Sequence, residues 1–362
     1  MDIKDIIGQT LTGEAGIRYS NIQAHSGNGI SEELEDNDIG FDLTLDAKKI
    51  ALDDTVARNN IAPEGEDYLK VNPNNQQERT FFKAESDIGV VFLKPVKYLS
   101  REHKYYQHLE SKGAEHPAIM PLEDVIHYNG KKLLVFPFIP FFPYADNSVT
   151  LDEYMLLHRI QEVPDKDKII LSIGYAIADA LDFMNEINAI HLDIKPQNIL
   201  CCPEDQTYPL RLCDFEATKI GERLPVTDKL RIEVEDVFST LFTPMYSSPE
   251  FIEKYLTPQA DVYSLGCILY DLFCGERENG NQNMFGFISA FSGDTGAFKL
   301  VMQSKGGEAL KEYGFLIPSD AMEAEQIPDY IKPVIAECLK FMPTDRYTPR
   351  ELKNELLMLL QD

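Results

Sequence analysis

The stretch HLDIKPQNIL, residues 191–200, decides which fold the rest of the sequence has to fit. It brings a carboxylate, an ammonium group and an amide into one short segment, as Asp193, Lys195 and Asn198. Phosphoryl transfer is catalysed mainly by positioning and by cations placed against developing negative charge. Asp193 can accept the proton of an attacking hydroxyl, Lys195 can reach the transferred phosphate, and Asn198 offers an oxygen to a divalent metal. The stretch therefore indicates a phosphoryl-transfer site.

A second metal ligand is expected on a nearby strand. The segment LRLCDFE, residues 210–216, supplies it, because an apolar strand ends at the carboxylate of Asp214. Alone, HLDIKPQN could be a turn with solvated charges. Together with Asp214, the spacing favours a site in which Asn198 and Asp214 hold one metal ion.

Composition limits the function further. The 362 residues include 60 acidic and 34 basic side chains, for a net charge of −26, which disfavours nucleic-acid and anionic-lipid partners. The six cysteines show no zinc-type pairing and are expected to be free, buried thiols in a reducing compartment. The start, MDIKDIIGQT, resembles no secretory signal, and no apolar run approaches the ~20 residues of a membrane span. We therefore expect a cytoplasmic protein.

Three regions differ in pattern. Residues 1–66 contain the acidic cluster SEELEDND and are expected to form an extension or a regulatory segment. Their glycine pair, Gly27 and Gly29, is interpreted as a turn rather than a phosphate loop. Residues 67–140 predict a small β-rich lobe with a hinge, and residues 141–362 a large α-helical lobe. Within them we expect strands at 68–71, 80–84, 89–96 and 133–139, and helices at 100–111 and 168–189. Two such lobes predict a ligand-binding cleft.

Five motifs in this order resemble those of the eukaryotic-type protein kinases, over Tyr68 to Leu360. HLDIKPQN resembles the catalytic loop H-R-D-x-K-x-x-N, and DFE the metal motif D-F-G. TPMYSSPE (243–250) resembles the peptide-docking segment that ends in A-P-E. DVYSLGCILYDL (261–272) resembles the helix whose aspartate, here Asp261, anchors the catalytic loop. PTDRYTPREL (343–352) resembles the late motif whose arginine, here Arg346, pairs with Glu250.

The resemblance implies a bilobal α+β fold and ATP-dependent phosphorylation of a protein substrate, with ATP and Mg²⁺ or Mn²⁺ as cofactors. Lys195 after Asp193, and Thr243 in the docking segment, resemble the Ser/Thr-specific class. In GVVFLKPVK it implies that Lys94 binds phosphates, with Lys97 as the alternative. Glu102 is its implied partner, with Glu110 as the alternative. Adenine is expected to meet the carbonyl of Pro137 and the N–H of Ile139.

Three positions depart from the family pattern. The loop NPNNQQER, residues 72–79, has no glycine, so backbone N–H groups approach phosphates less easily. We therefore expect weak resting ATP affinity that an activating partner, a small anionic effector or the acidic N-terminal segment raises. Leu192 replaces the arginine of H-R-D, which suggests that activation does not work through a phosphate on the activation segment. Glu216 replaces the glycine of D-F-G and either adds negative charge near the metals or serves as an extra ligand.

Two other function classes stay open. One is a pseudokinase that acts as a scaffold or allosteric module. The other is an enzyme of the same fold that acts on a small molecule or transfers a nucleotidyl group. A bacterial effector working in a host cytosol is also compatible with the acidic, divergent front region.

Overall fold

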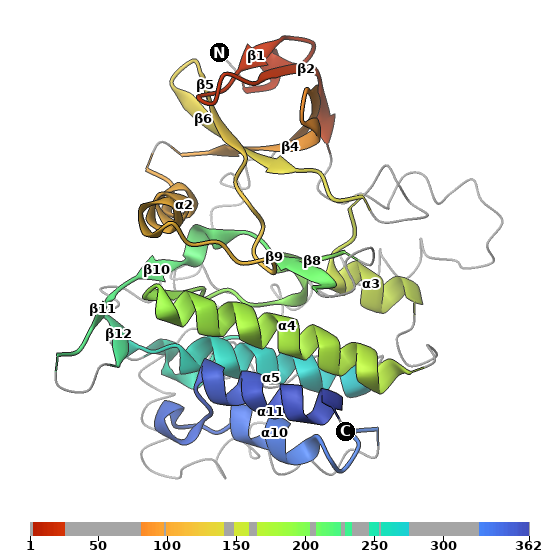
Figure 1. Ribbon diagram of the computed structural model, residues 1–362, viewed down its shortest axis with the longest axis vertical. Coiled ribbons are helices and arrows are strands. Elements are labelled where there is room, and N and C mark those ends of the chain that lie inside the picture. Colours follow the sequence, from red (N-terminus) through yellow and green to blue (C-terminus); the bar gives the residue numbers. More distant parts are fainter. Residues whose placement is uncertain are drawn as a thin grey trace, which may run out of the picture. The chain divides into compact units, whose positions relative to one another are not determined.

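The computed structural model describes residues 3–25, 81–97, 99–140, 148–158, 165–202, 208–225, 229–233, 246–252, 255–274 and 326–361. The chain divides into two compact units, which are described separately. The first unit combines residues 1–100 with residues 121–148 and is rich in strands. The second combines residues 101–120 with residues 149–362 and is mostly helical (Figure 1). No helix among the described residues is long and apolar enough to cross a membrane.

The first unit is a six-stranded antiparallel sheet in the order β1-β2-β3-β4-β6-β5. Its strands are β1 (Leu11–Thr12), β2 (Arg18–His25), β3 (Phe81–Ser86), β4 (Gly89–Val96), β5 (Asp124–Tyr128) and β6 (Lys131–Pro137). Alternate residues of β3 and β4, such as Phe82 and Leu93, are buried in its core, as the period of two in a strand requires.

Residues 3–25, which the sequence assigned to an N-terminal extension, belong to this sheet. β2 pairs with β3 from Tyr19 opposite Ser86 to His25 opposite Phe81. The strand that the sequence predicts at 68–71 lies outside the described residues, as does the loop 72–79. Residues 26–80 therefore connect two paired strands. The pairing joins residues so far apart that no local pattern indicates it.

The turn between β1 and β2 also joins the two edges of the sheet. The N–H of Glu14 donates to the carbonyl of Val125 in β5 at 2.9 Å. The carboxylate of Asp124 accepts from the Ala15 N–H and from the Tyr19 hydroxyl, both at 2.9 Å. β1 and β5 lie at opposite ends of the strand order, so these bonds cover both edges and leave less of them exposed for pairing with other chains.

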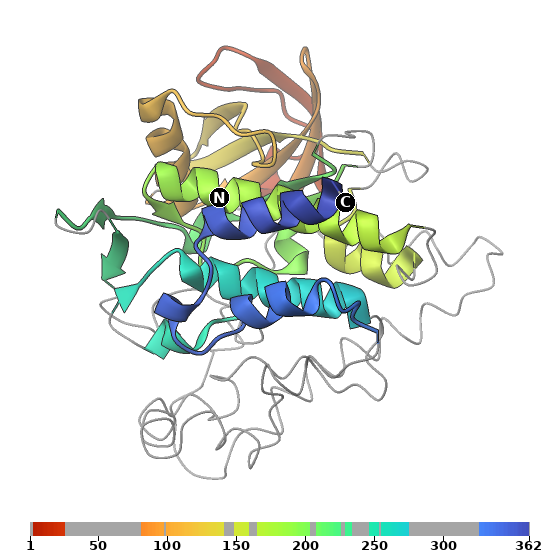
Figure 2. The same ribbon diagram turned by 60° about the horizontal axis from the view of Figure 1, so that its bottom comes forward.

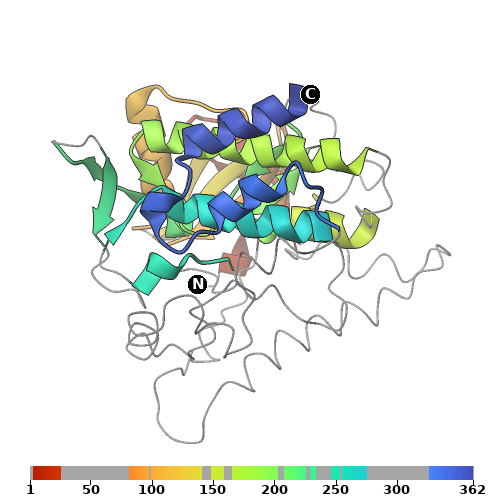
Figure 3. The ribbon, with the colours of Figure 1, turned by 90° about the horizontal axis from the view of Figure 1, so that it is seen from below.

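The second unit contains six α-helices among its described residues (Figures 1 to 3). They are α2 (Arg101–Lys112), α3 (Leu151–His158), α4 (Lys166–Glu186), α5 (Gln259–Cys274), α10 (Lys332–Cys338) and α11 (Pro349–Gln361). α4 packs against α5 and α11, and α5 packs against α10. The buried side of α4 repeats apolar residues at three and four, for example Ile170, Ile173 and Ile177, as the sequence predicted.

Among its described residues, this unit also contains three small sheets. β8 (Ile199–Cys201) pairs with β9 (Leu210–Leu212), and β7 (Ala189–Ile190) with β10 (Lys219–Ile220). β11 (Glu222–Arg223), β12 (Leu230–Glu233) and β13 (Tyr255–Leu256) form the third. α2, which the sequence assigned to the β-rich lobe, clusters with this unit. The six cysteines are free thiols, as expected, and four of them are buried.

Candidate active site

The catalytic-loop motif follows β7 and is held by a buried carboxylate of α5. The two oxygens of Asp261 accept the N–H groups of His191 and Leu192, each at 2.8 Å. Leu192 has a φ of 68°, which a branched apolar residue adopts only under constraint. Burial raises the pKa of Asp261 to about 7, although the two hydrogen bonds from the loop act to lower it. Asp261 therefore has the anchoring geometry that the resemblance implied.

Asp193, Lys195 and Asn198 are brought together by a short 3₁₀ helix, Pro196–Asn198. Lys195 Nζ lies 2.9 Å from Asp193 Oδ2. Asn198 Nδ2 donates to the same oxygen at 2.9 Å and to the Asp193 carbonyl at 2.8 Å. These two bonds use both amide hydrogens of Asn198, so its oxygen is the atom that can take a cation.

Strand register brings Asn198 and Asp214 to the same end of one hairpin. Ile199 is paired with Leu212, so the residue before β8 and the residues after β9 lie at neighbouring positions. The Cys213 N–H donates to the Asn198 carbonyl at 3.0 Å, which ties the two segments together. Asp214 has a φ of 61°, so the chain turns sharply at the carboxylate.

These two residues offer hard oxygen donors, which fit Mg²⁺ or Mn²⁺. Among the described residues, no group of three or more His, Cys, Asp and Glu side chains could hold a metal alone. A metal held by Asn198 and Asp214 would take its remaining oxygen ligands from water or a phosphate group.

Aromatic packing fixes the residue after Asp214. Phe215 is fully buried, and its ring stacks on Tyr105 of α2 with centroids 4.4 Å apart and an interplanar angle of 18°. The ring of His191 lies 5.0 Å from the ring of Phe215. Burial lowers the pKa of His191 to about 4, so its imidazole is neutral at pH 7. The metal motif is thus packed between the catalytic loop and α2.

α2 is attached to the helical unit by polar bonds as well. Glu102 Oε1 accepts the Phe215 N–H at 3.3 Å, and the Tyr106 hydroxyl donates to the Met120 carbonyl at 2.8 Å. Glu102 is buried, whereas the alternative Glu110 is exposed. Burial therefore favours Glu102 as the functional carboxylate of this helix.

Lys94 lies in β4 of the first unit, opposite Leu134 of β6. It is buried, whereas the alternative Lys97 is exposed. A buried lysine in the middle of a sheet needs a specific role, because burial disfavours its charge. Lys94 is therefore the better candidate for a phosphate-binding lysine.

The predicted hinge follows the end of β6. Pro137 is the last residue of β6 and lies opposite Val91. The next N–H, of Phe138, donates to the Val90 carbonyl at 3.1 Å, so the pairing continues one residue beyond the strand. The Ile139 carbonyl accepts from the Ser148 hydroxyl at 2.6 Å. Adenine binding by Pro137 and Ile139 stays a prediction.

The end of the predicted docking segment is fixed in the helical unit. Arg346 donates to both carboxylate oxygens of Glu250, at 2.6 and 2.8 Å, and both side chains are buried. The Ser264 hydroxyl of α5 donates to the Tyr246 carbonyl at 2.8 Å. Thr243, the other predicted residue of this segment, lies outside the described residues.

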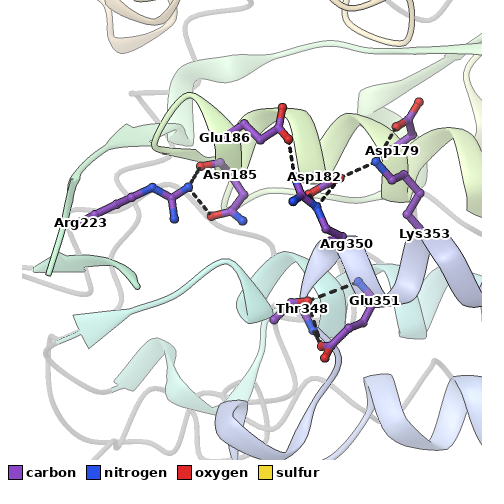
Figure 4. A network of polar contacts seen from close by, with 9 residues as sticks. All are labelled: Asp179, Asp182, Asn185, Glu186, Arg223, Thr348, Arg350, Glu351 and Lys353. Atoms are coloured by element: carbon purple, nitrogen blue, oxygen red, sulfur yellow. Dashed lines mark hydrogen bonds and ion pairs between the residues drawn. The ribbon is translucent and has the colours of Figure 1, made fainter. Parts of the chain in front are cut away.

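Sequence reasoning missed a charged network on α4 (Figure 4). Asp179, Asp182 and Glu186 follow one face of the helix and face Arg350 and Lys353 of α11. Burial acts to raise the pKa of Asp179, but its hydrogen-bonding partners outweigh that effect and lower the pKa to about 2. The spacing of three and four residues between the acidic side chains of α4, and of three between Arg350 and Lys353, places each set on one helix face and could have indicated this network.

It also missed the contacts of Arg223, in β11. Its Nε donates to Asn188 Oδ1 at 2.9 Å, and its terminal nitrogen donates to the Asn185 carbonyl at 2.6 Å. Asn185 lies in the last turn of α4 (Figure 4), and Asn188 lies two residues beyond the end of the helix. Nothing in the local sequence around Arg223 indicates this partner.

Comparison with known proteins points the same way as the geometry. A family model described as the protein kinase domain matches residues 90–358. The serine/threonine-protein kinase ATG1 of Debaryomyces hansenii is 25% identical over 235 residues, which are 60% of this chain and 22% of that protein. The probable serine/threonine-protein kinase PBL4 of Arabidopsis thaliana is 24% identical over 279 residues, 72% of this chain and 62% of that protein.

MAP kinase-activated protein kinase 2 of Cricetulus longicaudatus is 26% identical over 253 residues, which are 68% of this chain and 65% of that protein. The chain thus spans between 22% and 65% of the length of these three relatives. The family model covers well over half of the chain, and its range includes the catalytic loop, the metal motif and the Glu250–Arg346 pair. The chain belongs to the protein kinase family.

Proposed function

We propose that this protein kinase transfers the γ-phosphate of ATP to a Ser or Thr side chain of a protein substrate. The observation that carries the proposal is the bonded arrangement of Asp193, Lys195 and Asn198 beside Asp214. Two of these relatives are named serine/threonine-protein kinases, which supports Ser or Thr as the phosphorylated residue.

Each residue of the helical unit has a distinct role in this proposal. Asp193 accepts the proton of the substrate hydroxyl, and its contact with Asn198 orients the carboxylate for that purpose. Lys195 places a positive charge beside Asp193, where the transferred phosphate carries negative charge. Asn198 and Asp214 would hold Mg²⁺ or Mn²⁺, which supplies positive charge to the phosphates when bound.

The remaining roles follow from the family resemblance. Lys94 binds the α- and β-phosphates, and Glu102 is its carboxylate partner. Pro137 and Ile139 bind adenine through main-chain groups. Thr243 belongs to the segment on which the substrate peptide docks. Burial of Lys94 and Glu102 supports their assignment over Lys97 and Glu110.

A pseudokinase is the second candidate, and one observation favours it. The strands that flank the family's phosphate-binding loop are normally joined by a short glycine-rich turn, whereas here β2 ends at His25 and β3 begins at Phe81. Such a long connection has a higher ordering cost than a tight turn. Residues 26–80 therefore bear on nucleotide affinity. The predicted need for a partner, a small anionic effector or the acidic N-terminal segment rests on the glycine-free loop 72–79 within them.

ATP turnover separates the two candidates. Purified wild-type protein is incubated with ATP and Mg²⁺ or Mn²⁺, with and without cell extract, and ADP formation and nucleotide affinity are measured. Turnover that depends on Asp214, as tested by Asp214→Asn, supports the kinase. Nucleotide binding without any turnover, or no binding under any condition, supports the pseudokinase. Asp329→Asn, at an exposed position outside the site, is the control.

A further inference from the structure

The segment that follows the metal motif begins against the catalytic loop. β10 pairs with β7, so that Lys219 lies opposite Ile190 and Ile220 opposite Ala189. Ile190 immediately precedes His191, the first residue of the catalytic loop. The Thr218 side chain is buried, and its hydroxyl donates to the His191 carbonyl at 3.5 Å. Contacts that hold the chain beyond β10 therefore also restrain β7, the strand that precedes the catalytic loop and Asp193.

Two contacts hold the chain just beyond β10, and both are made with the end of α4. The Gly221 N–H donates to the Asn188 carbonyl at 2.9 Å. The guanidinium of Arg223 spans the Asn188 side chain and the Asn185 carbonyl. A side chain at 221 would disturb this arrangement, because its Cβ would lie 2.7 Å from Ile232 Cγ1.

The electrostatic setting makes this arginine more than a surface contact. Carbonyl groups at the C-terminal end of a helix carry partial negative charge and favour a cation. The last turn of α4 has no basic residue of its own and contains Glu186. Arg223 thus supplies a cation to the main-chain carbonyl of Asn185 at this end, through charge-assisted hydrogen bonds, whereas Arg350 binds the Glu186 side chain. In the catalytic loop, the side chain of Leu192 is buried and uncharged, so this position supplies no cation to the segment.

A three-stranded sheet extends this attachment. Arg223 lies opposite Leu230, and Ile232 of β12 lies opposite Leu256 of β13, which leads into α5. Leu230, Ile232 and Leu256 are buried. The segment is therefore attached at one side to α4 by Arg223 and at the other to the start of α5 by strand pairing.

We infer that Arg223 is a positioning residue that keeps β10 and β11 aligned with the catalytic loop by binding the C-terminal end of α4. This role rests on the proposed kinase activity, because the aligned loop carries Asp193. Arg223 touches no reacting atom. Its removal should lower turnover while leaving nucleotide affinity unchanged, since the residues proposed to bind adenine and phosphate lie elsewhere.

The test compares Arg223→Met with Arg350→Met in the full chain. Both variants remove an arginine that binds α4, but Arg350 comes from α11 and does not contact the segment after Asp214. Arg223→Met should speed hydrogen exchange at the Gly221 amide and lower kcat, each by about 10-fold or more, because it removes two charge-assisted hydrogen bonds. The KM for ATP should stay within about twofold, and Arg223→Lys should recover part of both losses.

Arg350→Met should leave the Gly221 exchange rate and kcat unchanged. Equal exchange and equal kcat in Arg223→Met and wild type would overturn the inference. So would the same losses in Arg350→Met, because they would show a general loosening of α4. If the wild type transfers no phosphate, the proposed function fails. The exchange rate at Gly221 still decides whether Arg223 anchors the segment.

Discussion

The buried pair between Glu250 and Arg346 gives a prediction whose size can be worked from the structure. The two guanidinium nitrogens bind the two carboxylate oxygens, and the side chains are only 0% and 6% exposed for Arg346 and Glu250. Arg346 also donates to the carbonyls of Lys340, Gln259 and Phe341. Replacing Glu250 by Ala leaves this cation buried with neutral partners only.

Removing one half of a buried ion pair typically costs ~3–5 kcal/mol. The three carbonyls that remain around Arg346 offset part of the loss, so the lower value is expected. For a unit of this size, each 1 kcal/mol lowers the melting temperature by about 2–4 °C. Glu250→Ala should therefore melt about 6–12 °C below wild type.

Thermal unfolding followed by circular dichroism measures this difference. Glu337→Ala is the control, because Glu337 pairs with Lys340 at the surface and such pairs contribute ~1 kcal/mol or less. Arg346→Ala should cost as much as Glu250→Ala, and the double variant should cost less than the sum. A Glu250→Ala protein that melts within about 2 °C of the control would refute the reasoning.

Three further changes follow from the described contacts. Burial lowers the pKa of His191 to about 4 in the folded state, so the neutral imidazole stabilises the fold above its ordinary pKa. As the pH falls from there toward 4, up to ~3 kcal/mol of this unfolding free energy is lost. Between pH 7 and 4, urea unfolding should therefore show a smaller loss of stability for His191→Phe than for wild type. The buried hydroxyl of Tyr105 has no hydrogen-bond partner among the described residues, while its ring stacks on Phe215. Because Tyr105→Phe keeps the ring and removes an unsatisfied polar group, its melting temperature should equal or exceed that of wild type. A melting temperature several degrees lower would contradict this. A Cβ on Gly13 would lie 1.8 Å from Asp124 Oδ2, so Gly13→Ala should lower the unfolding free energy by ~1–3 kcal/mol. Thermal unfolding measures this loss. An unchanged stability would mean that the turn between β1 and β2 does not bind the sheet as described.

The protein kinase family and the α+β fold of a β-rich and a helical lobe were predicted from the sequence and are confirmed. This was possible because the decisive chemistry is local. Asp193, Lys195 and Asn198 lie within one loop, and the apolar strand before Asp214 pairs with the strand after that loop. Short separations leave few alternative arrangements, so spacing alone carries much of the geometry.

The N-terminal hairpin could not be predicted in the same way. β2 pairs with β3 across residues 26–80, and nothing in the acidic composition of that interval indicates the pairing. The assignment of α2 to the helical unit depends on the ring of Tyr105 lying on Phe215, a contact between distant positions. Such tertiary choices override local pattern.

Arg223 was missed for a related reason. In sequence it is one charged residue in a polar stretch, and most such residues are solvated. Its role depends on where α4 ends, on the carbonyl of Asn185 there, and on the Gly221 N–H that binds the Asn188 carbonyl and holds β11 nearby. Each of these is a property of the folded chain.

Transfer of labelled phosphate from ATP is the measurement that tests the central claim most directly. Wild-type protein is incubated with Mg²⁺ or Mn²⁺, an acceptor protein, and ATP labelled at either the γ- or the α-phosphate. The account predicts label on Ser or Thr from γ-labelled ATP only, and a loss of at least ~100-fold in Asp193→Asn, whose amide cannot take the proton. Full transfer by a correctly folded Asp193→Asn, or label arriving from the α-phosphate, would contradict the account.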